Sequence, residues 1–335
     1  MALGDTTIDP QLLDTLLRAR GGAAMARIAE KFSWTSTRLM DELDRLRAAG
    51  CEIEVNPAGH VRFERSGLGA WADYIRWSCA GRGTVEVYGR TTSTQDVARR
   101  LIADHGSNAD GALIAADVQT AGRGRMGRHW LAPPGTAALF SRVWVAEPRD
   151  SLFTTDRLLF ATAVAVSDAL EAVGGANGPE VRIRWPNDIL IEGLKVAGIL
   201  VESISLPPTD RGGAVSAAVI GVGVNVGLTP REVSDHMPEI DQVTSLAMCG
   251  VHADRLLVLA RIVQHMDHAL TTESTATLLD RWRRRSTVLD RRVALIHDGR
   301  TLHGRVVDLD PRDGLILRTD DGVAVHLPAE SSRII

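Results

Sequence analysis

The 335-residue chain is poor in several residue types, and each shortage excludes a class of protein. Its three cysteines, Cys51, Cys79 and Cys249, lie far apart without metal-ligand spacing, so we expect a reduced, cytoplasmic protein rather than a disulfide scaffold or a zinc site. No stretch approaches the ~18 uninterrupted apolar residues of a membrane-spanning helix. The first residues lack the basic start and apolar core of a signal peptide. We therefore expect no membrane contact.

Lysine is especially scarce. Of the 38 lysine and arginine residues, two are lysines, Lys31 and Lys195. In a chain that otherwise uses arginine, a lysine marks a position that needs a compact ammonium group rather than a planar fork, although drift would also leave two lysines. The net charge of −4 argues against a surface that grips nucleic acid as a whole.

The overall composition is that of an ordinary globular protein. Hydrophobic residues make up 44% of the chain and charged residues 24%, enough to bury a sizeable interior. The length suits two or three domains, since single domains mostly have roughly 100–200 residues.

Residues 1–65 predict three short helices followed by a hairpin. Apolar residues recur at helical spacing over 12–17, 25–32 and 39–46, and Gly50 provides a C-terminal cap for the third helix. Alternating apolar residues at 53–55 and 61–63 flank a turn at 56–59. This order predicts a winged helix-turn-helix.

The expected recognition helix offers Thr35, Ser36, Thr37 and Arg38 at its N-terminal end as DNA-binding residues. However, residues 1–65 contain nine basic and ten acidic residues, a net −1, and attraction to phosphates usually dominates affinity. DNA binding is therefore expected to need a dimer. The alternative is a module that only packs against its neighbour.

The remainder of the chain predicts an α+β protein. Residues 66–83 form a glycine-rich connector with a short helix around 71–77. Residues 84–287 mix apolar strands with helical runs too irregularly for a doubly wound parallel sheet, so we expect a mixed sheet flanked by helices. In residues 288–335, three Asp-Gly pairs separate short strands, which predicts a small all-β barrel.

The most informative stretch is residues 119–130, QTAGRGRMGRHW. Gly122, Gly124 and Gly127 satisfy the GxGxxG pattern of dinucleotide-binding proteins. That interpretation fails because Pro133 and Pro134 follow, where a helix would have to begin. No Walker A sequence occurs either, so a bound nucleotide would be held without a P-loop.

Arginine fills positions 123, 125 and 128 of this stretch. A glycine-rich backbone that carries three guanidinium groups is suited to wrapping a phosphate or a carboxylate. Because like charges repel, we expect the loop to be mobile when empty and to order around its ligand. The alternative is a solvated basic surface loop.

Three further clusters carry polar groups. The run Arg184-Trp-Pro-Asn-Asp188 predicts a turn between two strands, and Lys195 begins the next strand beside small residues at 197 and 198. A second cluster alternates glycine with apolar residues over 221–225, which indicates that something packs tightly on that strand face. The third, over 92–95, caps a helix that covers 94–102. For these clusters a purely structural turn or cap is the alternative.

In this order the four clusters resemble the bacterial biotin protein ligases, specifically the bifunctional type that also represses the biotin operon. The resemblance covers nearly the whole chain, and the combined motifs are far more specific than any one alone. It implies a winged helix-turn-helix at 1–65, a connector at 66–83, a ligase domain at 84–287 and an SH3-like barrel at 288–335. The ligase domain would be a mixed sheet related to the class II aminoacyl-tRNA synthetases.

The resemblance also implies roles for individual residues. Lys195, Arg123 and Arg125 would be catalytic, because they compensate the charge of the reacting carboxylate and phosphate. The implied biotin-binding residues are Ser93, Thr94, Gln95, Gln119, Arg123, Gly124, Arg125, Trp130 and Lys195.

ATP would contact Asn187, Asp188 and Asn225, and Asp188 would either bind the metal or orient the lysine. Two positions depart from the family's pattern. Gln95 replaces the common asparagine, and Met126 replaces a further arginine, which would soften the grip of the loop.

The implied activity is an ATP-dependent ligation. Biotin and ATP would give biotinyl-5′-AMP and pyrophosphate, with Mg²⁺, and a lysine of a biotin carboxyl carrier domain would then attack the mixed anhydride. The adenylate-bound protein would form a homodimer that binds operator DNA. The alternatives are a lipoate ligase and a non-enzymatic winged-helix sensor, whose pocket would lack the arginine and lysine cluster.

Overall fold

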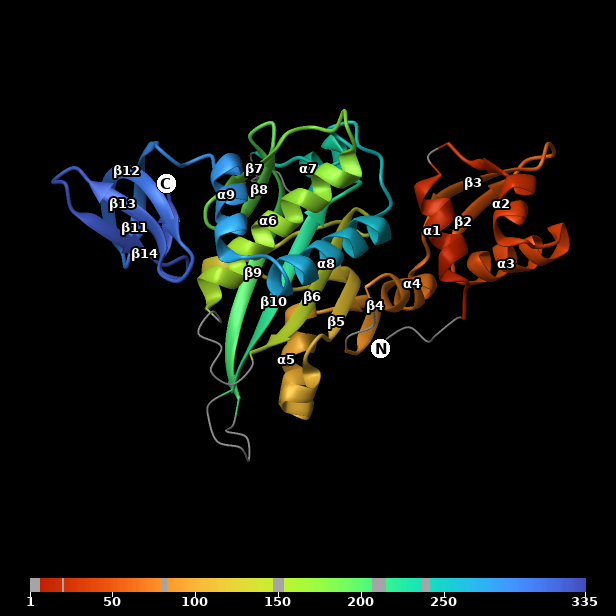
Figure 1. Cartoon of the computed structure of the whole chain (residues 1–335), viewed down its shortest axis with the longest axis horizontal. Helices are drawn as coiled ribbons and strands as arrows, with labels where there is room; N and C mark the ends of the chain where they lie inside the picture. Colours follow the sequence, from red (N-terminus) through yellow and green to blue (C-terminus); the bar gives the residue numbers. More distant parts are fainter. Residues whose placement is uncertain (1–6, 20, 80–82, 147–153, 207–214, 237–241) are drawn as a thin grey trace.

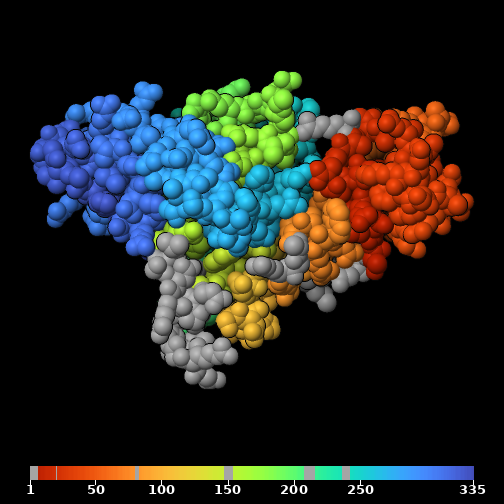
Figure 2. All heavy atoms as spheres, in the orientation of Figure 1, coloured from red at the N-terminus to blue at the C-terminus, as the bar shows by residue number. Residues whose placement is uncertain are grey.

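The computed structural model describes residues 7–19, 21–79, 83–146, 154–206, 215–236 and 242–335. Three bodies follow one another along the chain, with the N-terminal and C-terminal bodies at opposite ends of the central one (Figure 1). Both end bodies pack against the central body (Figure 2). Among the described residues, no helix is long and apolar enough to cross a membrane.

The N-terminal body combines three helices with a small antiparallel sheet. The helices are α1 (Pro10–Arg18), α2 (Met25–Phe32) and α3 (Ser36–Ala48). The strands β1 (Ala23–Ala24), β2 (Glu52–Val55) and β3 (His60–Arg65) lie in the order β1-β3-β2. Leucines at helical spacing, such as Leu13 and Leu43, are fully buried in its core. The predicted helices and hairpin are confirmed, and β1 was not predicted.

The connector is fastened to the central body. It contains η1 (Leu68–Ala70) and the predicted short helix, α4 (Trp71–Ser78), while residues 80–82 lie outside the described part. Buried Trp71 donates its Nε1 hydrogen to Ser66 Oγ (3.0 Å), which donates in turn to Asp254 (2.7 Å). Asp254 caps α8 (Arg255–Thr271) of the central body, so the connector is tied to a rigid helix.

A seven-stranded mixed sheet forms the centre, as the irregular alternation predicts. Its order is β4-β5-β6-β10-β9-β8-β7, in which β4 and β5 are parallel and the other pairs antiparallel. One face is covered by α6 (Thr155–Gly174), α8 and α9 (Thr275–Arg285), and the other carries α5 (Thr94–His105). The remaining elements are β4 (Val85–Thr91), η2 (Gly106–Ala109), β5 (Leu113–Gln119), η3 (Arg125–Gly127), β6 (Ala137–Val145), β7 (Val181–Arg184), β8 (Asp188–Ile191), β9 (Leu194–Leu206), β10 (Val215–Asn225) and α7 (Pro230–His236).

The C-terminal body is a five-stranded antiparallel sheet in the order β14-β13-β12-β11-β15. Asp298 and Gly299 join β11 to β12 with φ values of 47° and 77°, the two-residue turn that an Asp-Gly pair favours. The predicted all-β tail is confirmed, and β15 was not predicted. The strands are β11 (Arg292–His297), β12 (Arg300–Asp310), β13 (Gly314–Thr319), β14 (Ala324–Leu327) and β15 (Ser332–Ile334).

Candidate active site

A cavity of about 450 Å³ opens on the α5 side of the central sheet. Along β10, Ala218 and Ile220 belong to the core beneath α6, whereas Val219 packs with α5. Strand alternation therefore places Gly221 and Gly223 on the α5 side. The predicted site residues that line this cavity are Ser93, Thr94, Gln95, Gln119, Arg123, Gly124, Arg125, Trp130, Asn187, Asp188 and Lys195.

Gln119, at the end of β5, is held by its side-chain oxygen. Its Oε1 accepts hydrogen bonds from Ser93 Oγ (3.1 Å), Thr94 N (2.7 Å) and Thr94 Oγ1 (3.2 Å). Ser93 also caps α5 by accepting from the Gln95 N–H (3.3 Å), so its capping and pocket-lining roles coexist. Because the oxygen of Gln119 is used within the protein, its amide offers the NH₂ group to a ligand.

Gln95 presents the opposite polarity. Its Nε2 donates to the Leu200 carbonyl (3.3 Å), whereas its Oε1 is buried without a hydrogen-bond partner among the described residues. A buried unpaired oxygen costs about 1–3 kcal/mol, so this atom is available to a hydrogen-bond donor in the cavity. Gly221 makes room for the amide, because a Cβ at that position would lie 3.0 Å from Gln95 Nε2.

Trp130 lies on a floor of two glycines. Gly198 of β9 and Gly223 of β10 are direct partners in the sheet, and a Cβ at these positions would approach the indole to 2.9 and 2.6 Å. The prediction that something packs tightly on the glycine face is confirmed, and the group is the chain's own Trp130. The buried Nε1 of Trp130 has no partner among the described residues. The Lys195 ammonium lies 5.5 Å from the ring centroid.

Lys195, near the start of β9, faces a carboxylate on β8. Lys195 Nζ lies 2.6 Å from Asp188 Oδ1, and Arg184 Nη2 lies 3.0 Å from Asp188 Oδ2. Burial opposes the ionisation of Asp188, but the two cations outweigh it and hold the pKa of Asp188 below its usual value. Asp188 is therefore a charged partner that orients the lysine.

This arrangement does not fit the Mg²⁺ role that the sequence left open for Asp188. Each of its carboxylate oxygens is paired with a cation, so a metal ion would have to displace Lys195 or Arg184. In the described part of the chain, the group of three potential metal ligands lies elsewhere, in the C-terminal body, and consists of Asp310, Asp313 and His326.

The loop over residues 122–130, here called the glycine–arginine loop, is folded. Gly124 N donates to Arg128 O (2.7 Å), and Trp130 N donates to Gly122 O (3.0 Å). Gly122 is required there because a Cβ would meet Trp130 O at 2.4 Å. Met126 has a left-handed backbone (φ 54°) and is 51% exposed at the tip, so it faces solvent rather than the cavity.

The arginines of this loop have separate acceptors. Arg125 Nη2 donates to the backbone oxygens of Ala329 and Ser332 (3.1 Å for Ser332), so it ties the loop to the C-terminal body. Burial lowers the pKa of the Arg125 guanidinium. Arg123 pairs with carboxylates on α5 and β9. The expected repulsion is therefore offset at Arg123, whereas at Arg125 the charge of Arg128 joins burial in lowering the pKa of the guanidinium.

Asn225 does not line the cavity among the described residues. It is buried at the end of β10 and donates its Nδ2 hydrogen to Thr244 O (3.0 Å), while its own carbonyl accepts from Leu246 N (3.1 Å). Asn225 thus holds residues 244–246 against the end of β10 through these two hydrogen bonds. The resemblance instead implies that Asn225 contacts the nucleotide.

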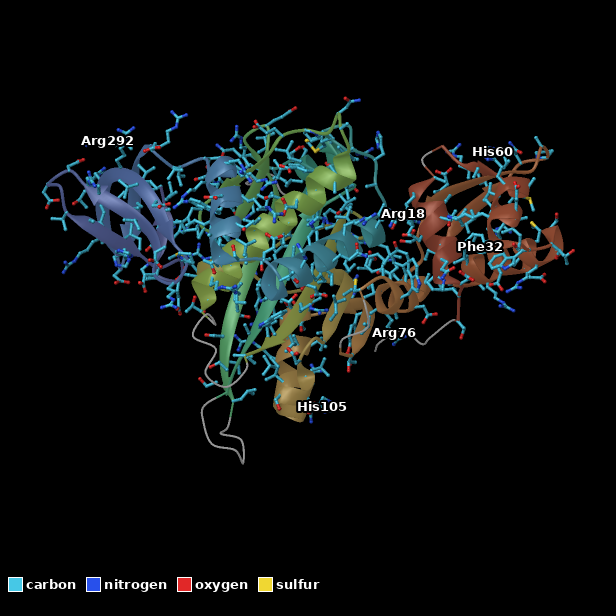
Figure 3. All side chains as sticks on the ribbon, in the orientation of Figure 1. Arg18, Phe32, His60, Arg76, His105 and Arg292 are labelled. Carbon is cyan, nitrogen blue, oxygen red and sulfur yellow. The ribbon has the colours of Figure 1, made fainter. Side chains whose placement is uncertain are left out.

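The predicted DNA-binding residues, Thr35, Ser36, Thr37 and Arg38, lie at the start of α3 in the N-terminal body, away from the cavity (Figure 1). Thr35 caps α3 by accepting from the Arg38 N–H (3.2 Å). The Arg38 guanidinium lies 4.7 Å from the centroid of Trp34, which stacks on Phe32. Figure 3 labels Phe32 in the N-terminal body. The side chain of Arg38 is thus already in contact with an aromatic ring.

Some cavity residues were not predicted. Arg184 lines the cavity and is the first residue of the run Arg184-Trp-Pro-Asn-Asp188. Its positive charge was the feature of the sequence that could have indicated it. Gln242 and Val243 reach the cavity by pairing with β9, where Lys195 N donates to Gln242 O (2.8 Å). Nothing in the local sequence indicates that pairing.

Comparisons with known proteins agree with this geometry. Residues 87–225 match the model of the biotin/lipoate A/B protein ligase family, and residues 288–329 match the biotin protein ligase C-terminal domain. The bifunctional ligase/repressor BirA of Bacillus subtilis (strain 168) is 30% identical over 319 residues, which cover 89% of each chain. The biotin–[acetyl-CoA-carboxylase] ligase of Paracoccus denitrificans is 32% identical over 246 residues, 72% of this chain and 97% of that protein. The structure of the Aquifex aeolicus biotin protein ligase with biotin and ATP superposes with a TM-score of 0.58 at 25% identity, covering 75% of this chain and 99% of that chain.

Proposed function

The chain belongs to the biotin protein ligase family and is a ligase, and from this premise we propose that it makes biotinyl-5′-AMP and transfers biotin to one lysine of a biotin carboxyl carrier domain. The observation that carries the proposal is the convergence of the predicted residues, including the Lys195–Asp188 pair, around one cavity. The ligand-bound relative from Aquifex aeolicus supports biotin and ATP as the substrates.

The polar end of the cavity suits the ureido ring of biotin. A cyclic urea has one carbonyl acceptor and two N–H donors. The NH₂ group of Gln119 is a donor for that carbonyl, and the unpartnered Oε1 of Gln95 is an acceptor for an N–H. Ser93 and Thr94 hold Gln119 in this orientation.

The charged end suits the reacting groups. Two anions, a carboxylate and a phosphate, must meet in the first step, so charge compensation and in-line positioning are the main tasks. Lys195, oriented by Asp188, brings an ammonium to that end of the cavity, and Arg125 brings a guanidinium. Trp130 over the glycine floor shields the mixed anhydride from water.

Of the three predicted ATP-binding residues, Asn187 and Asp188 line the cavity and Asn225 does not. Asn187 lines the cavity and its Oδ1 lies 3.4 Å from Arg125 Nη1, so we retain it at the nucleotide end. Asn225 would act through the backbone of the segment it fastens. Since Asp188 is paired with two cations, Mg²⁺ would arrive with the triphosphate of ATP rather than at this carboxylate.

We further propose that the N-terminal body is a winged helix-turn-helix that represses transcription when the adenylate-bound protein dimerises on a two-fold operator. The support is the element order and the names of the bifunctional relatives. The proposed boundaries remain 1–65, 66–83, 84–287 and 288–335, with a central domain like the class II synthetases and an SH3-like C-terminal barrel.

The ligase proposal is tested by the mass of a carrier domain after incubation with biotin and Mg·ATP. A shift equal to one biotinyl group, dependent on both substrates, is the expected result. An unmodified carrier would contradict it. Lipoate in place of biotin tests the lipoate ligase alternative, and an unmodified carrier with retained biotin binding would indicate a non-enzymatic sensor.

A further inference from the structure

We propose that Asp96 and Glu202, two carboxylates outside the cavity, are positioning residues that hold the glycine–arginine loop closed through Arg123 and so set how long biotinyl adenylate is retained. The proposal rests on the proposed function, since it concerns that intermediate. It gives Arg123 a task other than the predicted charge compensation.

The Arg123 guanidinium reaches two elements of the central body. Its Nη2 pairs with Asp96 Oδ1 in the first turn of α5, and its Nη1 lies 3.7 Å from Glu202 Oε2 on β9. Asp96 is fixed on its other oxygen, which accepts from Thr92 Oγ1 (2.8 Å). The carboxylate is therefore held in place to receive the arginine.

Glu202 is shared with a second arginine. Arg99, one turn after Asp96 on α5, donates to Glu202 through Nη2 (2.7 Å) and Nε (3.4 Å). Charges of opposite sign thus alternate from Asp96 through Arg123 and Glu202 to Arg99. The side chains of Arg123, Asp96 and Glu202 are 37%, 27% and 22% exposed. A single exposed ion pair contributes little, but a network of partly buried charges contributes more.

Anchoring this side chain also anchors Trp130. The backbone of Arg123 forms an antiparallel β-bridge with the backbone of His129. On either side of this bridge, Gly124 N donates to Arg128 O, and Trp130 N donates to Gly122 O. The backbone that carries the indole is therefore joined to the backbone of Arg123 on both sides. Arg125 contacts the C-terminal body instead, so Arg123 is the arginine of this loop that ties it to α5 and β9.

The test measures escape of the intermediate. Wild-type protein and the Asp96→Asn/Glu202→Gln double variant are loaded with labelled biotin and Mg·ATP, and release of the adenylate is followed after a chase with unlabelled biotin. We expect release about threefold to tenfold faster from the double variant, because modest ion-pair energies convert to small factors in rate. The rate of pyrophosphate formation should change less than twofold.

Two controls separate loop closure from general effects. Asp104→Asn removes the same charge from the exposed end of α5, and wild-type retention is expected. Asp96→Glu and Glu202→Asp keep both charges and should retain the adenylate longer than the neutral double variant. Raising the salt concentration should accelerate release from the wild type more than from the double variant, because salt screens ion pairs. An equal melting temperature shows that the double variant is folded.

The outcomes distinguish this proposal from the proposed function. A wild-type protein that forms no adenylate would overturn the proposed function. A wild-type protein that retains the adenylate, with a double variant that retains it equally long and with the same salt response, would overturn the role of Asp96 and Glu202 alone. Equally fast release from Asp104→Asn would also overturn it, since net charge would then be the cause.

Discussion

The central cavity and the N-terminal body use the same residue types in different ways. In the cavity, Lys195 and Arg184 share one carboxylate, and the guanidinium of Arg125 rests on backbone oxygens instead of a carboxylate. In the N-terminal body, most of the described arginines have a carboxylate of their own, as in Arg18–Asp14, Arg45–Glu42, Arg47–Asp44 and Arg65–Glu52. The first arrangement leaves positive charge for a ligand, and the second neutralises it.

The difference shows that net charge is a poor guide to anion binding. A concave site with more cations than carboxylates concentrates a positive potential, whereas paired charges on a convex surface nearly cancel. Both regions resemble the bifunctional ligases in sequence, yet the geometry supports the ligase site more directly than it supports an operator-binding surface. The following experiments test that contrast.

Removing the cavity lysine should have the largest effect. Lys195→Ala removes the ammonium oriented by Asp188, and losing one preorganised donor commonly lowers rates on the order of 10²–10³-fold. Pyrophosphate release with biotin and Mg·ATP is the measurement. Lys31→Ala, the other lysine, removes a contact to Thr15 in the N-terminal body and should leave the rate unchanged. Near-normal adenylate formation by Lys195→Ala would contradict the assignment.

Arg125→Ala should release the intermediate. The change removes the bonds to Ala329 and Ser332 and a cation of the cavity, so we expect dissociation of the adenylate about tenfold to a hundredfold faster. Lysines of unrelated proteins nearby should then become biotinylated. The dissociation rate checks this, with Arg312→Ala, an exposed arginine of the C-terminal body, as a charge-matched control. Unchanged retention would count against the loop as a cover.

A methyl group on the glycine floor should displace Trp130. At Gly223 a Cβ would approach the indole to 2.6 Å, whereas at Gly227 it would meet nothing within 4 Å. Overpacking of this kind costs about 1–3 kcal/mol, so Gly223→Ala should weaken adenylate retention about tenfold and Gly227→Ala should not. Equal retention by the two variants would show that the floor does not position the indole.

A smaller effect is expected for DNA binding, which should require the bound adenylate. We expect salt-dependent binding to a biotin-operon sequence only with biotin and ATP, because a single module with a net charge of −1 and mostly paired arginines attracts phosphate weakly. Arg38→Ala should lower that affinity about threefold while ligation stays unchanged, since Arg38 lies on α3 of the N-terminal body and does not line the cavity. Absence of binding at low salt would leave a ligase whose N-terminal body only packs against its neighbour.

The smallest effect is expected from Asp14 of α1. Burial opposes its ionisation, but Arg18 and Tyr74 outweigh it and lower the pKa of Asp14 below 3.8. Its stabilisation is therefore present at neutral pH and is lost as the pH falls through that lowered pKa. Asp14→Asn should cost about 0.5–1 kcal/mol of stability at pH 7, an effect that disappears in acid, while ligation is unchanged. Urea unfolding at a series of pH values from 7 downward measures it, and a cost that does not decline as the pH falls through the lowered pKa of Asp14 would contradict the ionic origin.

Local patterns in the sequence predicted most of the elements. Helical leucine spacing, Asp-Gly turns and the irregular strand–helix order correctly indicated the helices, the all-β tail and the mixed sheet. The short strands β1 and β15 were missed, because two or three residues carry too little periodicity and their pairing partners are distant in sequence. Gln242 was missed for the same reason, since it enters the cavity by pairing with β9.

The sequence by itself indicated most of the residues that line the cavity, because the family motifs and the glycine positions are local features of the chain; Asn225, Gln242 and Val243 are the exceptions. The tertiary structure decided which partner each charged side chain contacts. It paired Asp188 with Lys195 and Arg184, turned Arg123 toward Asp96 and Glu202, and set Trp130 on the glycines. An ionic side chain selects its partner by distance and burial in three dimensions, and neither quantity can be read from spacing along the chain.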